Sequence, residues 1–252
     1  MIENMSIKDI ESHLLLIWLI FFGVVTFGLI VSWNEGFISL LFKGDRSHIS
    51  IIITLIFILA TVHGANRTVQ LSRQIGLADR IAELLATATS IGLVADHIVI
   101  DTDTPLPDSD VSQYVHDLLL TRRGEQSSEE VVASRTDLLD VFANKARSPH
   151  EVGWFIVDML IKLGLLGTII GFIMMLASVG QTTSVDVSSM QKVLTQMSNG
   201  MGTALYTTFA GLTGSILLAA QYHLLDHGVD TLIEKTVTLT EVHIIPALAE
   251  KV

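Results

Sequence analysis

Long apolar runs alternate with polar stretches along this chain, and four of the runs are long enough to cross a bilayer. A hydrocarbon core of about 30 Å needs about 20 apolar residues in a helix that rises about 1.5 Å per residue. The runs cover about residues 13–33, 49–64, 154–178 and 201–222. We therefore predict an all-α membrane protein with four transmembrane helices and long cytoplasmic helical extensions.

The polar stretches carry signals for helices outside the membrane. Apolar residues recur near the helical period over 66–99, and a shorter helix is expected over 111–122. A capping box at Ser127 to Glu130 predicts a helix to about residue 147. Ser148 and Pro149 form a second start signal, for a helix to about residue 178. The next proline after 189 is Pro246, so one helix is predicted over about 189–245.

The distribution of basic residues predicts the orientation. Eight of the fifteen lysines and arginines lie between the second and third spans, so this segment should be cytoplasmic, with both termini on the same side. Four regions follow. They are a transmembrane hairpin (1–65), a cytoplasmic helical domain (66–147), a second pair of transmembrane helices (148–222) and a cytoplasmic helical tail (223–252).

Composition excludes several classes of function. A net charge of −11 argues against a nucleic-acid partner, because phosphate binding needs a basic surface. The absence of cysteine excludes disulfides and thiolate metal sites. Phosphate-binding loops, nucleophile elbows and His-Glu-x-x-His runs are also absent, so we predict that the protein is not an enzyme.

Three polar motifs have a simpler interpretation than a functional site. His63 closes the second span, and we interpret it as a boundary residue rather than a proton relay. The aspartates of 101–110 lack the glycine and the closing glutamate of an EF-hand loop, so they indicate a turn rather than a calcium site. His223 and His227 could pair on a metal, but a solvated helix face explains them better.

Small and hydroxyl residues form a stripe at helical spacing on each of the last two spans. Small residues let helices approach closely in lipid, and hydroxyls place polar oxygens in the membrane without a charge. Helix packing alone explains most such stripes, and an ion pathway is the alternative. The stripes are Gly164, Thr168, Gly171, Met175 and Ser178 on the third span, and Ala204, Thr208, Gly211, Ser215 and Ala219 on the fourth.

The motifs on these stripes resemble those of a known family. Gly164-Leu-Leu-Gly-Thr168 followed by Gly171, and then Gly200-Met-x-x-Ala-Leu-x-x-Thr208-x-x-Gly211-Leu212, are similar to the MotA/TolQ/ExbB proton channels. The resemblance implies the channel subunit of an ion-driven motor in the bacterial inner membrane. It also implies a homopentamer around two copies of a single-span MotB/TolR/ExbD-like partner, whose aspartate enters the pore.

The resemblance assigns roles to particular residues. Thr168 and Thr208 would line the pore near the partner's aspartate, where hydroxyl oxygens can hold water or a partly dehydrated cation. The translocated ion would be a proton or sodium, with no other cofactor, metal or catalytic residue. Tyr206 and Thr207 point elsewhere on the helix and rank lower. The other predicted pore-lining residues are Gly164, Gly171, Ala204, Gly211 and Ser215.

The spans contain no central charged residue, since Asp158 and Lys162 lie near one end and can pair with each other. Ion conduction would therefore depend on the partner's acid. The family's usual proline is replaced by Ile161-Lys162, and the subfamily stays open between the flagellar-stator and TolQ/ExbB branches. The driven process is open as well. A structural or scaffold membrane protein and a small transporter that acts alone are the competing hypotheses.

Overall fold

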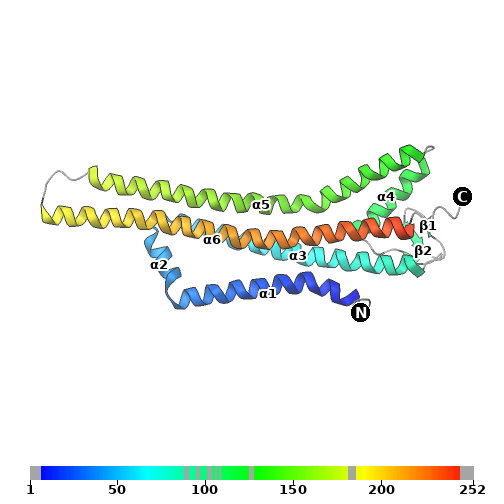
Figure 1. Cartoon of the computed structure of the whole chain (residues 1–252), viewed down its shortest axis with the longest axis horizontal. Helices are drawn as coiled ribbons and strands as arrows, with labels where there is room; N and C mark the ends of the chain where they lie inside the picture. The colour runs from blue at the N-terminus through cyan, green and yellow to red at the C-terminus, as the bar shows by residue number, and fades with distance from the viewer. Residues whose placement is uncertain are drawn as a thin grey trace. The chain divides into compact units, whose positions relative to one another are not determined.

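The computed structural model describes residues 7–87, 91–94, 97–100, 104–105, 107, 109–124, 128–180 and 186–244. Helices dominate this part of the chain, and one short sheet interrupts them (Figure 1). The elements are α1 (Ile7–Asn34), α2 (Phe37–Gly44), α3 (Ile49–Thr87), β1 (Ile91–Val94), β2 (His97–Ile100), β3 (Thr104–Pro105), α4 (Asp110–Gly124), α5 (Ser128–Gly180), α6 (Val187–Leu239) and a π-helical turn (Thr240–Ile244).

In the described part of the chain, four helices are long and apolar enough to cross a membrane. Their candidate spans are Leu14–Asn34, Ile49–Leu84, Arg135–Val179 and Val187–Val242, which contain the four runs predicted from the sequence apart from residue 13. The predicted class, an all-α membrane protein with several spans, is thereby confirmed. Helix α6 also ends close to its predicted boundary, with the π-helical turn after Leu239.

The prediction of a helix over 66–99 is wrong in its last part. Helix α3 ends at Thr87, and β1 and β2 then pair in an antiparallel hairpin, with Ile91 opposite Ile100 and Val94 opposite His97. Ile98, Val99 and Ile100 are β-branched, and such residues favour strands over helices. Half of the residues of the predicted turn over 101–110, namely 101–103, 106 and 108, lie outside the described residues.

The second start signal does not begin a helix. Helix α5 runs from Ser128 to Gly180 with Pro149 inside it, so Ser148 is not an N-cap. A proline inside a helix removes one hydrogen bond and costs about 3 kcal/mol. The turns before Pro149 nevertheless stay helical, because Phe142 is buried in a core and Ala146 packs against it.

The chain divides into two compact units, each formed from segments that are distant in sequence. We call them the head unit and the membrane unit. The head unit comprises Met1–Ile17, Asn66–His150 and Leu224–Val252, and the membrane unit comprises Trp18–Ala65 and Glu151–His223.

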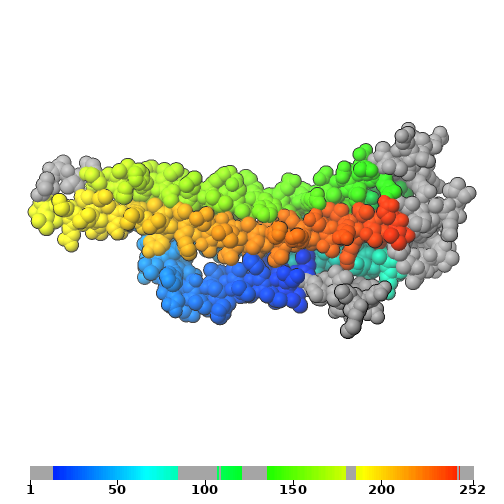
Figure 2. All heavy atoms as spheres, viewed as in Figure 1, coloured from blue at the N-terminus to red at the C-terminus, as the bar shows by residue number. Residues whose placement is uncertain are grey.

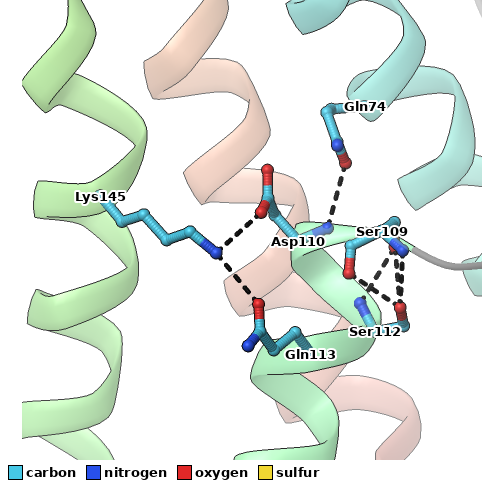
Figure 3. Close-up of polar contacts among 6 residues, drawn as sticks. All are labelled: Gln74, Ser109, Asp110, Ser112, Gln113 and Lys145. Carbon is cyan, nitrogen blue, oxygen red and sulfur yellow. Dashed lines mark hydrogen bonds and ion pairs between the residues drawn. The ribbon is translucent and has the colours of Figure 1, made fainter.

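The head unit has a hydrophobic core between α3, α4, α5 and α6. The α3 residues at helical spacing supply one wall, as their sequence pattern predicts for Ile75 and Ala78. Lys145 of α5 ties α4 in place through Asp110 (2.9 Å) and Gln113 (3.0 Å), as Figure 3 shows. The buried core residues are Leu71, Ile75, Ala78, Ile81, Val111, Tyr114, Val115, Leu118, Phe142, Val229, Leu232, Leu239 and Ile244.

In the membrane unit, a buried carboxylate holds the turn between α2 and α3. Asp45 accepts hydrogen bonds from the Ser47 amide (2.8 Å), the Ser47 hydroxyl (2.6 Å) and the Ser50 amide (2.7 Å). The Thr203 hydroxyl of α6 binds this turn from the other side, donating to Gly44 O (3.2 Å). Burial raises the pKa of the Asp45 carboxyl, but the hydrogen bonds together outweigh it and hold the pKa below its ordinary value of 3.8.

We expect the stability of this turn to depend on pH with a defined sign. Because the folded pKa of Asp45 is lowered, its contribution is present above pH 3.8 and is lost as the pH falls through the folded pKa. Asp45→Asn should lower the thermal unfolding midpoint in mild detergent at pH 6 and reduce the further loss on acidification. Glu35→Gln, which changes an exposed carboxylate, is the control. Equal midpoints for Asp45→Asn and the unchanged protein at pH 6 would contradict this role.

Candidate functional site

The small residues predicted from the sequence lie where α5 and α6 run antiparallel to each other in the membrane unit. Gly164 and Gly211 face each other there. A Cβ atom added to Gly211 would lie 2.7 Å from the Leu160 carbonyl oxygen and 2.8 Å from the Gly164 Cα. Both are backbone atoms, which cannot move aside as a flexible side chain can, so this contact requires glycine.

The same close approach continues along the two helices. A Cβ atom on Gly171 would lie 2.6 Å from the backbone nitrogen of Ala204 and 2.6 Å from the carbonyl oxygen of Gly200. A Cβ atom on Gly167 would lie 2.2 Å from the Thr207 hydroxyl oxygen. The surfaces of α5 and α6 abut in the space-filling view (Figure 2). The stripes therefore pack two helices of one chain together.

The two threonines predicted to line a pore flank this contact and stay partly exposed. The Thr208 hydroxyl donates to the Ala204 carbonyl (3.0 Å) and lies 3.3 Å from the Gly164 carbonyl of α5. The Thr168 hydroxyl donates to the Leu165 carbonyl (2.5 Å). A hydroxyl has one proton and two acceptor lone pairs. Because the hydroxyl protons of Thr168 and Thr208 both point at backbone carbonyls, each hydroxyl oxygen can accept a hydrogen bond from a group outside the two helices.

The remaining predicted pore residues are distributed differently. Gly164, Gly171 and Gly211 are buried between α5 and α6, and Ala204 is partly exposed. Ser215 is 3% exposed and its hydroxyl donates to the Leu212 carbonyl (2.9 Å). The chain thus buries most of this set by itself, and its role in lining an ion pathway stays a prediction.

Sequence reasoning missed two side chains of α6 that complete the packing. Thr207 has no exposed surface and fills the space above Gly167. The Tyr206 ring covers Gly44, where a Cβ atom would lie 2.2 Å from a ring carbon. Gly167 lies inside the motif from Gly164 to Thr168, so the motif could have predicted its close contact with α6.

A polar contact between α3 and α6 was missed as well. His63 is partly buried, and its Nδ1 atom lies 2.9 Å from the hydroxyl of the fully buried Tyr222. Gly153 of α5 leaves room for the tyrosine ring, since a Cβ atom there would lie 2.0 Å from a ring carbon. Beside this pair the Gln221 amide lies 3.5 Å from the Thr61 hydroxyl. His63 is therefore more than a boundary residue, because its ring joins two helices.

Charged groups add little to this site. Asp158 and Lys162 form an exposed ion pair on one face of α5, as their spacing predicts. Among the described residues, no group of three or more His, Asp or Glu side chains could hold a metal ion. The site consists of hydroxyls and close helix packing.

The sequence of these two helices matches the model of a known protein family. Residues 122–237, slightly less than half of the 252-residue chain, match the model of the MotA/TolQ/ExbB proton channel family. These residues are similar in sequence to that family. The resemblance read from the motifs of α5 and α6 is thereby confirmed. No curated protein and no solved structure matches the chain.

The matched segment contains every predicted site residue, from Gly164 on α5 to Ser215 on α6. Helices α1, α2 and α3 lie outside it. The family is one of membrane channels rather than enzymes, in agreement with the lack of catalytic motifs in the sequence.

Proposed function

We propose that this protein is the channel subunit of an ion-driven motor in the bacterial inner membrane. It conducts protons, or sodium, together with a single-span partner of the MotB/TolR/ExbD kind, and converts ion flow into mechanical work. The family match and the four spans support the membrane channel class. The identity of the motor and of its partner is part of the proposal.

The pair of threonines beside the α5–α6 contact carries this proposal. Their hydroxyl protons are directed at helix carbonyls, so Thr168 and Thr208 present acceptors. An acceptor pair suits a protonated carboxyl group, which can donate a hydrogen bond, and it suits a partly dehydrated cation. A bare carboxylate would require a hydroxyl to rotate away from its carbonyl. The threonines would thus favour the partner's acid in its protonated form.

The chain needs such a partner, because the predicted spans hold no acid at depth. Asp158 is exposed near one end and paired with Lys162. Proton transfer through a membrane generally depends on an ionisable group in the pathway. In this proposal the partner helix supplies that group as an aspartate. We prefer protons to sodium on the family resemblance alone.

Assembly and orientation follow the family in this proposal. Five copies surround two partner helices, with the exposed faces of α5 and α6 towards the pore or the neighbouring copy. Large apolar side chains cover these faces, and they need neighbours or lipid. Both termini lie in the cytoplasm, as the basic residues predict. The exposed residues include Leu165, Ile169, Phe172, Leu205, Phe209 and Ile216.

One observation favours a second function, that of a structural or scaffold membrane protein. The glycines of α5 and α6 are used in packing within one chain, and that packing does not require an ion pathway. A scaffold would have no need of the two partly exposed threonines. The two functions differ in whether the chain conducts.

We expect partner-dependent ion flux. The chain would be produced alone and together with a candidate single-span membrane protein that carries a membrane aspartate, and inverted vesicles would be prepared from each. A pH-sensitive dye should report faster collapse of an imposed proton gradient only when both proteins are present. A parallel imposed sodium gradient identifies the ion. Equal collapse rates in all vesicles, at equal protein levels, would favour the scaffold.

A further inference from the structure

Charged side chains on the helices of the head unit are mostly paired within the chain. The pairs join different helical elements of this unit. Figure 3 shows one of them, between α5 and α4. They are Lys145–Asp110 (2.9 Å), Arg147–Asp230 (2.9 Å), Lys235–Asp79 (2.5 Å) and Arg135–Glu241.

Among the exposed charges that form no ion pair within the described residues, two arginines lie on α3 and two aspartates lie on α5. Arg73 and Arg80 lie on the outer face of α3, seven residues apart and therefore on the same side of the helix. Asp137 and Asp140 lie on the outer face of α5. Within the described residues, none of the four has an ion-pair partner in the chain. One chain thus presents a basic face on α3 and an acidic face on α5.

The ion pairs between α5 and the chain of α6 show which residues of the two segments lie side by side. We call the position along these helix axes the height of a residue. Arg147 of α5 lies beside Asp230 of α6. Arg135, nearer the start of α5, lies beside Glu241 in the π-helical turn that follows α6. The stretch of α5 between these arginines therefore lies beside the stretch of chain from Asp230 to Glu241.

Arg80 of the basic face lies at the same height in the head unit as the acidic face. Lys235 falls within that stretch of α6, and it binds Asp79, the residue before Arg80 on α3. Asp137 and Asp140 fall within the facing stretch of α5. Copies of a membrane protein sit at one depth in the bilayer, so residues of equal height meet when copies stand side by side.

We propose that the α3 face of one copy, with Arg73 and Arg80, docks on the α5 face of the next copy, with Asp137 and Asp140. The occupant is a second copy because one chain carries both complementary faces at matching height. An exposed apolar side chain lies on each face, Val69 (39% exposed) on α3 and Val141 (65% exposed) on α5. This inference rests on the proposed assembly of several copies and adds the residues that join them outside the membrane.

The contact is heterologous, since two different surfaces meet. A heterologous contact continues from copy to copy and closes into a ring when the rotation allows it. Exposed ion pairs contribute little affinity. They set which surfaces meet and in what register, because like charges disfavour the alternatives. The charges would therefore decide the arrangement of copies, and the membrane helices would provide most of the affinity.

Cross-linking tests this contact directly, because the chain contains no cysteine. The full-length variant Arg80→Cys with Asp140→Cys would be treated in membranes with a short bifunctional maleimide. We expect a ladder of covalent species larger than a dimer, since each copy offers both faces. Each single-cysteine variant should give at most dimers. Arg80→Cys with Glu234→Cys, which uses an exposed acid on α6 at similar height, is the matched control and should give no ladder.

Charge reversal supplies the second test. Arg80→Glu alone and Asp140→Arg alone should each reduce the oligomer fraction several-fold in native mass measurements in mild detergent, and the double variant should restore it. Oligomers that persist unchanged in both single variants, or a control pair that cross-links equally, would overturn the proposed contact while leaving assembly intact. A monomer for the unchanged chain would overturn the assembly on which the contact rests.

Discussion

Thr208→Val is expected to abolish partner-dependent ion flux while leaving the protein assembled in the membrane. Valine matches threonine in shape but has no hydroxyl, so the partner's acid loses one hydrogen-bond acceptor. Leaving a buried polar group without a partner costs about 1–3 kcal/mol, and more for charged groups. That range corresponds to a roughly 5- to 150-fold change in the equilibrium between the bound and released acid. Thr168→Val should have the same effect.

The neighbouring threonine provides the matched control. Thr207 also loses a hydroxyl on substitution by valine, but it has no exposed surface and its hydroxyl donates to the Thr203 carbonyl (2.9 Å) within the helix. Thr207→Val should therefore retain most of the flux. Flux would be measured in vesicles that contain equal amounts of each variant and of the partner. Normal flux for both Thr168→Val and Thr208→Val would mean that these threonines only pack, and the proposed pathway would be wrong.

Gly211→Ala should destabilise the membrane unit although alanine favours helices. The added Cβ atom would lie 2.7 Å from the Leu160 carbonyl oxygen and 2.8 Å from the Gly164 Cα, so α5 and α6 must separate. Overpacking of this kind costs typically about 1–3 kcal/mol. The separation would also move Thr208 away from the Gly164 carbonyl, so we expect a lower thermal unfolding midpoint together with lower flux.

Gly23 of α1 is the control for this substitution. A Cβ atom there would meet nothing within 4 Å. Gly23→Ala should leave the midpoint unchanged or raise it, because alanine is preferred over glycine inside a helix by about 1 kcal/mol. Thermal unfolding followed by circular dichroism in mild detergent compares the two variants. A midpoint for Gly211→Ala at or above that of Gly23→Ala would show that the helices can part without loss.

These two experiments separate the roles that share one stripe. Loss of a threonine hydroxyl should affect flux without affecting stability, whereas an added methyl group on the stripe should affect both. A scaffold protein would respond to Gly211→Ala but not to Thr208→Val. The comparison therefore distinguishes helix packing from ion conduction within the same pair of helices.

The sequence by itself determined the features that depend on local pattern. Runs of apolar residues long enough for a bilayer located the four spans, because hydropathy and length suffice for that assignment. Helical spacing placed Gly164, Thr168, Thr208 and Gly211 on two stripes, because the period of a helix is fixed. The family motif lies on the same residues, and the match to residues 122–237 agrees with it.

Tertiary structure decided which surfaces those stripes meet. A stripe of small residues can pack against a helix of the same chain or against a helix of another copy. Here the stripes of α5 and α6 pack against each other within one chain. Contacts between residues far apart in sequence determined two further features, the continuation of α5 through Pro149 and the link between α3 and α6. The Phe142 core keeps α5 helical through Pro149, and the 2.9 Å contact joins His63 to Tyr222. Local pattern cannot specify such contacts, because they depend on which distant segments come together.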